Sequence, residues 1–286
     1  MLKRFGLLAG GIICISLAIA IILAFNLKPY GYHPNKLGTN IIISLFLLPV
    51  LIAPILEEIR YRGFLSNKKY INILFLILTP LNLFFGEFTW HSIGIILAIY
   101  LAYYIYRKSR KNIILFSLVL LSAIHFVLNH IPKNINISWE YLPYIMIPFG
   151  MALILSWIII NYSIRKAILM HAFWNLLIGL IFLSSLQFVS SEKNINENEF
   201  YKLEWNRVPY FESNKRFFKD STGIYIGKTV DLGEVLFLIK ADSFVAAEPS
   251  MKYNLKYQDY KNESLWKSNF LNLLEKEGLI IKRKAF

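Results

Sequence analysis

Aspartate is absent from the first 189 residues of this 286-residue chain, and only four glutamates occur there. That part of the chain therefore cannot supply the pair of aspartates on which aspartyl proteases depend. It also contains neither Gly-x-Ser-x-Gly nor His-Glu-x-x-His. These absences argue against serine-hydrolase and zinc-protease mechanisms, because each motif holds its catalytic groups in a defined local geometry.

Cysteine and charge are also scarce. Cys14 is the single cysteine, so no disulfide can form within the chain. Charged residues make up 17% of the chain and hydrophobic residues 56%, a composition typical of membrane proteins. Of the net charge of +13, the part before Ser190 carries +11, from 15 Lys/Arg and four Asp/Glu. These basic residues lie beside apolar runs, so the positive charge is explained by the ends of membrane helices. It therefore does not predict a nucleic-acid partner.

The apolar runs are long enough to cross a bilayer, which takes about 20 helical residues. We therefore expect an all-α polytopic membrane protein with about seven transmembrane helices and a small C-terminal α+β soluble domain. The first helix is expected to be uncleaved, because its apolar run is too long for a signal peptide. The expected helices cover residues 5–25, 41 through the Glu57–Glu58 segment, 70–85, 92–106, 112–130, 141–160 and 167–188.

The placement of lysine and arginine predicts the orientation. With the N-terminus inside, twelve basic residues fall on the inner side and three on the outer side. We expect an integral membrane protein of a bacterial plasma membrane, with a cytoplasmic N-terminus and an extracytoplasmic C-terminal domain. The inner set is Lys3, Arg4, Arg60, Arg62, Lys68, Lys69, Arg107, Lys108, Arg110, Lys111, Arg165 and Lys166, and the outer set is Lys28, Lys36 and Lys133.

From Ser190 the composition becomes polar and charged, which predicts a second domain over residues 189–286, after a transmembrane domain over residues 1–188. It contains no motif of known chemistry, so we interpret it as a stabilising or docking appendage. The expected elements are a linker over 192–199, strands over 230–241, 251–257 and 279–282, and an amphipathic helix over 263–277.

Two adjacent glutamates and two arginines continue the second apolar run. Ionisable groups at membrane depth are costly and by default mark function. Glu58 and Arg62 stand four apart on one helical face and are expected to form an ion pair. Glu57 has only Arg60, three residues on, as a possible partner, so it is freer to act as a general base. The alternative is that both carboxylates are solvated at a helix end.

Histidines supply the remaining candidate chemistry. His171 and Asn175 stand four apart on one face of the last apolar helix, where one can donate to an oxyanion that the other positions. The helix before residue 130 offers two further candidates, His125 and His130. Depth counted along straight helices favours His125 as the partner of Glu57, although helix ends predicted from sequence shift by two to four residues.

These segments resemble the CPBP family of CAAX-type and bacteriocin-processing intramembrane proteases. The stretch 54–63 is similar to the Glu-Glu-x-x-x-Arg motif of that family, and 171–175 is similar to its His-x-x-x-Asn motif. The stretch 126–130 matches the Phe-x-x-x-His motif, which selects His130 over His125. The resemblance covers about residues 40–180. The chain departs from the family in Asn129 and in an extra hairpin over residues 70–106.

The resemblance implies an intramembrane glutamic endopeptidase that needs no metal or other cofactor and acts on a membrane-embedded or lipid-anchored peptide or protein. Glu57 would activate a water, and Glu58 and Arg62 would support it. His130 would position the water or Glu57, and His171 with Asn175 would stabilise the oxyanion.

Three alternatives stay open. The first alternative is an inactive scaffold of the same fold. The second is a proton-coupled transporter, although no inverted repeat supports it. A zinc site made by Glu57, His130 and His171 is chemically possible, because two imidazoles and a carboxylate are familiar zinc ligands.

Overall fold

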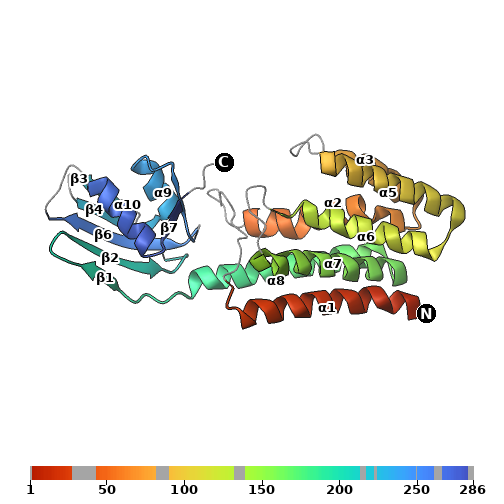
Figure 1. Cartoon of the computed structure of the whole chain (residues 1–286), viewed down its shortest axis with the longest axis horizontal. Coiled ribbons are helices and arrows are strands. Elements are labelled where there is room, and N and C mark those ends of the chain that lie inside the picture. The colour runs from red at the N-terminus through yellow and green to blue at the C-terminus, as the bar shows by residue number, and fades with distance from the viewer. Residues whose placement is uncertain are drawn as a thin grey trace. The chain divides into compact units, whose positions relative to one another are not determined.

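In a computed structural model the described residues form two compact units, one up to Leu177 and one from Ile178. The first is helical and the second contains the strands (Figure 1). The structure describes residues 2–27, 43–81, 90–131, 139–212, 217–221, 224–248, 250–260 and 266–282. The turn predicted at Gly86–Glu87 and the loop residue Lys133 lie outside these ranges.

A helix overlaps each of the seven segments that the sequence predicts as helical, and α5 and α8 begin before the predicted segments. The helices are α1 (Leu2–Ala24), the π-helical η1 (Ile43–Ile52) that leads into α2 (Ala53–Arg62), α3 (Lys69–Leu78), α5 (Trp90–Ser109), α6 (Asn112–Leu128), α7 (Leu142–Asn161) and α8 (Ile164–Gln187). Short 3₁₀ turns occur as η2 (Gly63–Leu65), η3 (Thr79–Leu81) and η4 (Trp139–Tyr141).

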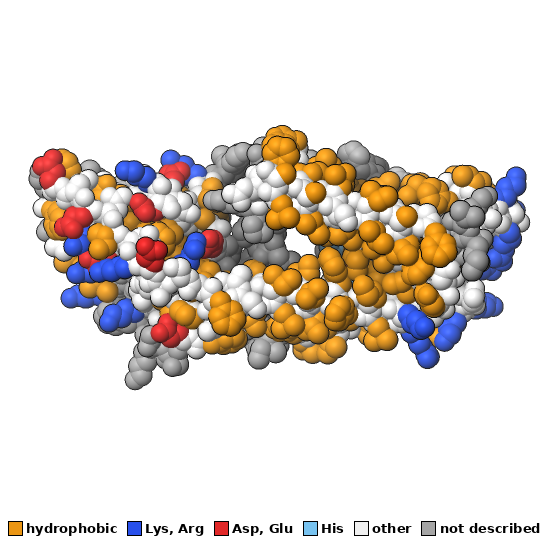
Figure 2. Space-filling model, turned by 90° about the horizontal axis from the view of Figure 1, so that it is seen from below, with side chains coloured by type: hydrophobic (Ala, Val, Ile, Leu, Met, Phe, Trp, Pro, Cys, Tyr) orange, Lys and Arg blue, Asp and Glu red, His pale blue; other side chains and the backbone are white. Residues whose placement is uncertain are grey.

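Three of the described helices are long and apolar enough to cross a membrane, over Phe5–Ala24, Leu142–Asn161 and Ile164–Gln187. The apolar stretches Lys69–Leu81 and Asn112–Leu128 are shorter than a full crossing. The prediction of seven crossings is therefore not confirmed. The helices nevertheless expose many large apolar side chains. Figure 2 shows one face of the molecule, on which hydrophobic side chains cover much of the helical part. This apolar surface and the three long helices are those of an integral membrane protein.

Helices α1 and α7 approach each other at two glycines. A Cβ atom on Gly11 would lie 2.6 Å from the carbonyl oxygen of Gly150, and one on Gly150 would lie 2.7 Å from the carbonyl oxygen of Gly11. Small residues at such a crossing let two backbones pack closely, as is common between membrane helices. The contact leaves the opposite side of α7 available for α2.

Helix α2 is held between α6 and α7 by a buried aromatic cluster. The Tyr61 ring meets the Phe126 ring edge-on, with 5.2 Å between centroids, and Ser122 donates a hydrogen bond to the Tyr61 carbonyl oxygen. On the other side, Arg62 Nε donates to the carbonyl oxygen of Ala152, at 3.3 Å. These contacts fix the rotation of α2 and therefore decide which way its carboxylates point.

The C-terminal domain is built on an antiparallel sheet in the order β1-β2-β6-β4-β3, with a second sheet of β5 and β7. Helix α10 covers one face of the larger sheet, where Phe270 packs against Tyr225 and Tyr257. The elements are β1 (Asn194–Glu197), β2 (Tyr201–Val208), β3 (Phe217–Ser221), β4 (Ile224–Asp231), α9 (Leu232–Leu238), β5 (Phe244–Ala246), β6 (Lys252–Asp259), α10 (Trp266–Lys276) and β7 (Ile280–Lys282).

Two expectations for this domain are wrong. The strand predicted over 230–241 stops at Asp231, whose side chain accepts a hydrogen bond from the Glu234 N–H and caps helix α9. This N-cap overrides the strand propensity of the apolar run that follows. Part of the predicted linker forms the edge strand β1, because Asn194–Glu197 pairs with Lys202–Trp205.

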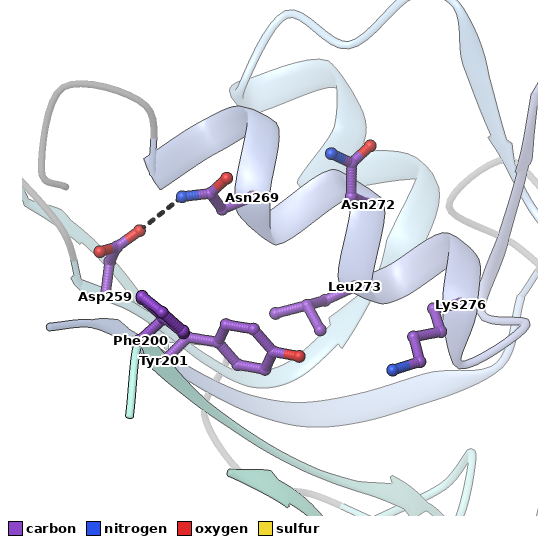
Figure 3. A pocket seen from close by; sticks show the side chains of 7 residues that line it. All are labelled: Phe200, Tyr201, Asp259, Asn269, Asn272, Leu273 and Lys276. Atoms are coloured by element: carbon purple, nitrogen blue, oxygen red, sulfur yellow. Dashed lines mark hydrogen bonds between the residues drawn. The ribbon is translucent and has the colours of Figure 1, made fainter. Parts of the chain in front are cut away.

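A hollow of about 420 Å³ lies between α10 and the start of β2. Figure 3 shows the Tyr201 ring along it, with Asp259 toward one end and Lys276 toward the other. Asp259 Oδ2 accepts hydrogen bonds from Asn269 and from the Tyr257 hydroxyl, at 2.9 and 3.0 Å. These bonds connect α10 to the end of β6. They also supply the hydrogen-bond donors that a buried carboxylate needs, so Asp259 has a structural explanation.

Candidate active site

Two prolines shape the approach to the glutamates. Pro54 lies in the first turn of α2. The N–H groups of a first turn have no partner within the helix, so the N–H that Pro54 lacks costs α2 no hydrogen bond. In the π-helical pattern of η1, however, that N–H would bond the carbonyl five residues earlier, at Pro49. Asn175 Nδ2 donates to this Pro49 oxygen at 2.7 Å. Asn175 therefore ties α8 to the entry of α2.

Glu58 lies at the centre of the buried part of the site. Its side chain is 0% exposed, and its Oε1 accepts from Arg62 Nη1 at 2.5 Å and contacts His171 Nδ1 at 2.8 Å. Because a carboxylate only accepts, the Nδ1 of His171 carries the hydrogen. The imidazole is thus held with its Nε2 pointing away from Glu58.

Arg62 is itself anchored on three sides. Besides Glu58 and the Ala152 carbonyl oxygen, its guanidinium lies 4.8 Å from the centre of the Phe126 ring. A cation over an aromatic face is attracted by the ring electrons. The Glu58–Arg62 pair expected from the helical spacing is therefore formed, and it leaves little freedom for either side chain.

Glu57 has the opposite environment. Its side chain is 26% exposed, and its Oε2 lies 3.6 Å from His171 Nε2 and 3.9 Å from His130 Nε2. His130 Nδ1 contacts the Phe126 carbonyl oxygen at 2.7 Å, so this nitrogen carries the hydrogen. Both histidines thus present their Nε2 atoms to the same oxygen of Glu57.

The two helix histidines are separated by the end of α6. The helix ends at Leu128, and His130 lies in the following turn, where its N–H bonds the Val127 carbonyl oxygen at 2.8 Å. This turn returns the His130 ring toward Glu57. His125 is buried against Tyr61 instead, with ring centroids 5.2 Å apart. The depth count, which favoured His125, assumed a straight helix through residue 130.

The structure therefore brings Glu57, Glu58, Arg62, His130 and His171 together, whereas Asn175 bonds Pro49 at the edge of this group. The sequence interpretation gave no role to the Pro49 carbonyl. Pro54 is the signal that would have indicated it, because its missing N–H leaves the carbonyl five residues earlier without a π-helical partner.

Among the described residues, no group of three His, Cys, Asp or Glu side chains has a metal-holding arrangement. The acidic group with its two imidazoles is a candidate site for acid–base chemistry, because one carboxylate is partly open while its neighbour is locked.

The apolar helices around two carboxylates and two imidazoles are those of an integral membrane protein with a candidate acid–base site. Residues 39–177 match the family described as type II CAAX prenyl endopeptidase Rce1-like, so this part of the chain matches the CAAX protease family. The matched range includes all three motifs and leaves out the C-terminal domain. Neither a curated protein nor a solved structure matches the chain significantly.

Proposed function

We propose that the chain is an intramembrane glutamic endopeptidase in which Glu57 activates the water that attacks a peptide carbonyl. The observation that carries this proposal is the contrast between the two adjacent glutamates. Glu58 is locked by Arg62 and His171, whereas Glu57 is partly exposed beside two imidazole nitrogens. An open carboxylate with fixed neighbours is suited to general-base catalysis.

The distances around Glu57 support a place for the water. At 3.6 and 3.9 Å, the His171 and His130 nitrogens are too far from Glu57 Oε2 for direct hydrogen bonds, and such gaps suit a bridging water. Glu57 would take one proton as the water oxygen bonds to the carbonyl carbon. It would return that proton to the leaving amine when the C–N bond breaks.

The remaining residues would orient this reaction. His130 would hold the water through its unprotonated Nε2, and the Glu58–Arg62 pair would keep His171 in one orientation. His171 and Asn175 would lie on the side of the developing oxyanion, with Asn175 as the hydrogen-bond donor, because the His171 hydrogen lies on Nδ1 and bonds Glu58. An amide NH₂ has two donor hydrogens, so Asn175 can hold the Pro49 carbonyl with one and offer the other to the oxyanion.

The substrate class follows from the family description. A CAAX motif is a C-terminal cysteine followed by three residues, and the cysteine carries a prenyl chain. We propose that the chain cleaves such a lipid-anchored protein or peptide, which its apolar surface would meet within the bilayer. The partners are then the bilayer and the anchored substrate, and no nucleic acid is expected.

We also propose that the N-terminus is cytoplasmic, that the membrane domain ends with α8 near residue 188, and that residues 189–286 lie outside the cytoplasm. On the visible face in Figure 2, Lys and Arg side chains gather at one end of the helical part, which supports a single basic side. A reporter active only in the cytoplasm should work when fused after Lys111 and be silent after Phe286. The reverse pattern would overturn this orientation.

The deciding experiment compares wild type and Glu57→Gln on a fluorogenic farnesylated peptide in lipid nanodiscs. Glu57→Gln keeps the shape of the side chain and removes the base, so cleavage should fall by about 10²–10⁴ while folding is unchanged. Near-wild-type cleavage by a folded Glu57→Gln protein would disprove the role of Glu57.

The same assay after exhaustive chelation separates the glutamate mechanism from a zinc mechanism. We expect full activity and no stoichiometric zinc by elemental analysis. Loss of activity together with loss of bound zinc, and recovery of both on zinc addition, would assign Glu57, His130 and His171 to a metal instead.

A further inference from the structure

Arg60 is a half-buried cation with two nitrogens that lack a hydrogen-bond partner in the described part of the chain. Its Nε and Nη2 atoms are shielded from solvent and have no hydrogen-bond partner among the described residues. Its guanidinium lies 5.1 Å from the centre of the Tyr61 ring, and it interacts electrostatically with Glu57. Glu57, however, directs its carboxylate oxygen to His130 and His171, and no ion pair between Glu57 and Arg60 is found in the described residues.

The other arginine of α2 is more fully engaged. Arg62 has a carboxylate, a carbonyl oxygen and an aromatic face around it, and its Nη2 alone lacks a hydrogen-bond partner among the described residues. Arg60, two residues earlier, has an aromatic face and the more distant charge of Glu57, and two of its nitrogens lack a hydrogen-bond partner there. An uncompensated charge away from water costs several kcal/mol and is retained at membrane depth chiefly for function. The two nitrogens of Arg60 without a hydrogen-bond partner can therefore take an anion that arrives from outside the chain.

The free atoms indicate which anion fits. Nε and Nη2 form one edge of the planar guanidinium, and two parallel N–H groups on one edge match the two oxygens of a carboxylate. Arg60 is only half-buried, so an anion can approach the side chain from its accessible part. We propose that Arg60 binds a carboxylate of the substrate, supplied by the C-terminus of the chain being cleaved.

This proposal rests on the proposed function, because the same site must hold the peptide. Glu57 and Arg60 are three residues apart, a rise of about 4.5 Å along the helix, to which the length of the arginine side chain is added. An extended peptide advances at most about 3.5 Å per residue. The carboxylate is therefore expected within about three residues of the bond that Glu57 attacks. An acidic side chain at the same distance is the alternative source of the same group.

The test uses three farnesylated peptides with three residues after the cysteine, in nanodiscs with the full chain. One ends in a free carboxylate, one in a carboxamide, and one in a carboxamide with Asp as the last residue. Wild type should prefer the free carboxylate to the carboxamide by about 10- to 100-fold in kcat/KM, mainly through KM, as for a hydrogen bond to a charged group. Restored cleavage of the Asp peptide would assign the source to a side chain.

Arg60→Gln should reduce the ratio between the first two peptides to about one. The ratio is measured on one sample, so it does not depend on the fraction that is folded. Arg60→Lys keeps the charge without the fork and should give an intermediate ratio. Arg107→Gln, at the end of α5, is the matched control and should keep the wild-type ratio.

A wild-type protein that cleaves both peptides equally would overturn the carboxylate site while leaving the role of Glu57 intact. If wild type cleaves neither peptide, the proposed function fails, and binding then decides about Arg60. Glu57→Gln protein should bind the free-carboxylate peptide at least tenfold more tightly than the carboxamide peptide. The double variant Glu57→Gln/Arg60→Gln should bind the two peptides equally. Equal or absent binding of the two peptides would overturn the inference.

Discussion

The helical unit and the C-terminal domain differ in where their polar side chains lie: several are buried together in the helical unit, whereas most are exposed or partly exposed in the C-terminal domain. In the described part of the helical unit, buried polar side chains include Glu58, Arg62, Ser122, His125 and His171, and several of them meet around α2. In the described part of the C-terminal domain, the buried polar residues are Thr229 and Asp259. Its other charges form exposed or partly exposed pairs such as Lys202 with Glu197.

This difference indicates where the chemistry is. Exposed ion pairs contribute at most about 1 kcal/mol each and mostly keep a sheet soluble. Charges held away from water cost far more and persist where they are paired or used. The family match, which covers only the helical part, agrees with this division. The described residues of the C-terminal domain form a hollow, and their linked titratable groups, such as Lys202 with Glu197 and Glu204, are exposed or partly exposed.

The largest effect is expected from Glu58→Gln, which separates the two glutamates. This change leaves Arg62 charged, buried and without its carboxylate, and it frees His171. We expect loss of cleavage together with a loss of about 3–5 kcal/mol in stability. Thermal unfolding in detergent measures the stability, with Glu57→Gln as the partner variant that should unfold like wild type. Equal unfolding temperatures for the two variants would contradict the asymmetry.

The histidines provide the next test. His130→Ala removes a nitrogen that lies 3.9 Å from Glu57 and should abolish measurable cleavage. His125→Ala opens a small space beside Tyr61, so it should weaken the enzyme through packing and leave most of the activity. Initial rates on the farnesylated peptide give the comparison. An active His130→Ala beside an inactive His125→Ala would show that the wrong histidine was assigned.

Asn175→Ala should have a smaller effect than either glutamate variant. It removes the proposed oxyanion donor and the bond to the Pro49 carbonyl. Loss of one such donor typically lowers kcat by about 10²–10³. If Asn175 acts only on Pro49, the unfolding temperature should fall while kcat of the remaining folded protein stays near wild type, and that pattern would remove it from the oxyanion side.

The smallest effect is expected in the C-terminal domain and depends on pH. Burial and the neighbouring Asp259 carboxylate raise the pKa of the Tyr257 phenol. The folded domain therefore binds this proton more tightly than the unfolded chain, and that stabilisation is present at neutral pH and is lost as the pH rises above about 10. Tyr257→Phe should flatten this alkaline loss. Hydrogen exchange of β6 amides measures it, and cleavage near neutral pH should not change.

The local elements that depend on neighbours in the chain were predictable. The apolar runs gave seven helical segments, and the spacing of four between Glu58 and Arg62 gave their ion pair, because both depend on helical geometry alone. Strand β6, helix α10 and strand β7 follow from periodicity in the same way. Strand β1 was missed because an edge strand is defined by its pairing with β2.

Contacts between distant segments required the tertiary structure. The sequence alone determined that Glu57 and Glu58 differ in their helical partners, and the motif match preferred His130. Only the fold placed His130 beside Glu57, because the chain turns back after Leu128. Only the fold brought Asn175 to Pro49 and left two Arg60 nitrogens without a hydrogen-bond partner among the residues that the structure describes. These outcomes depend on how helices pack at their ends, which the periodicity of any one helix does not specify.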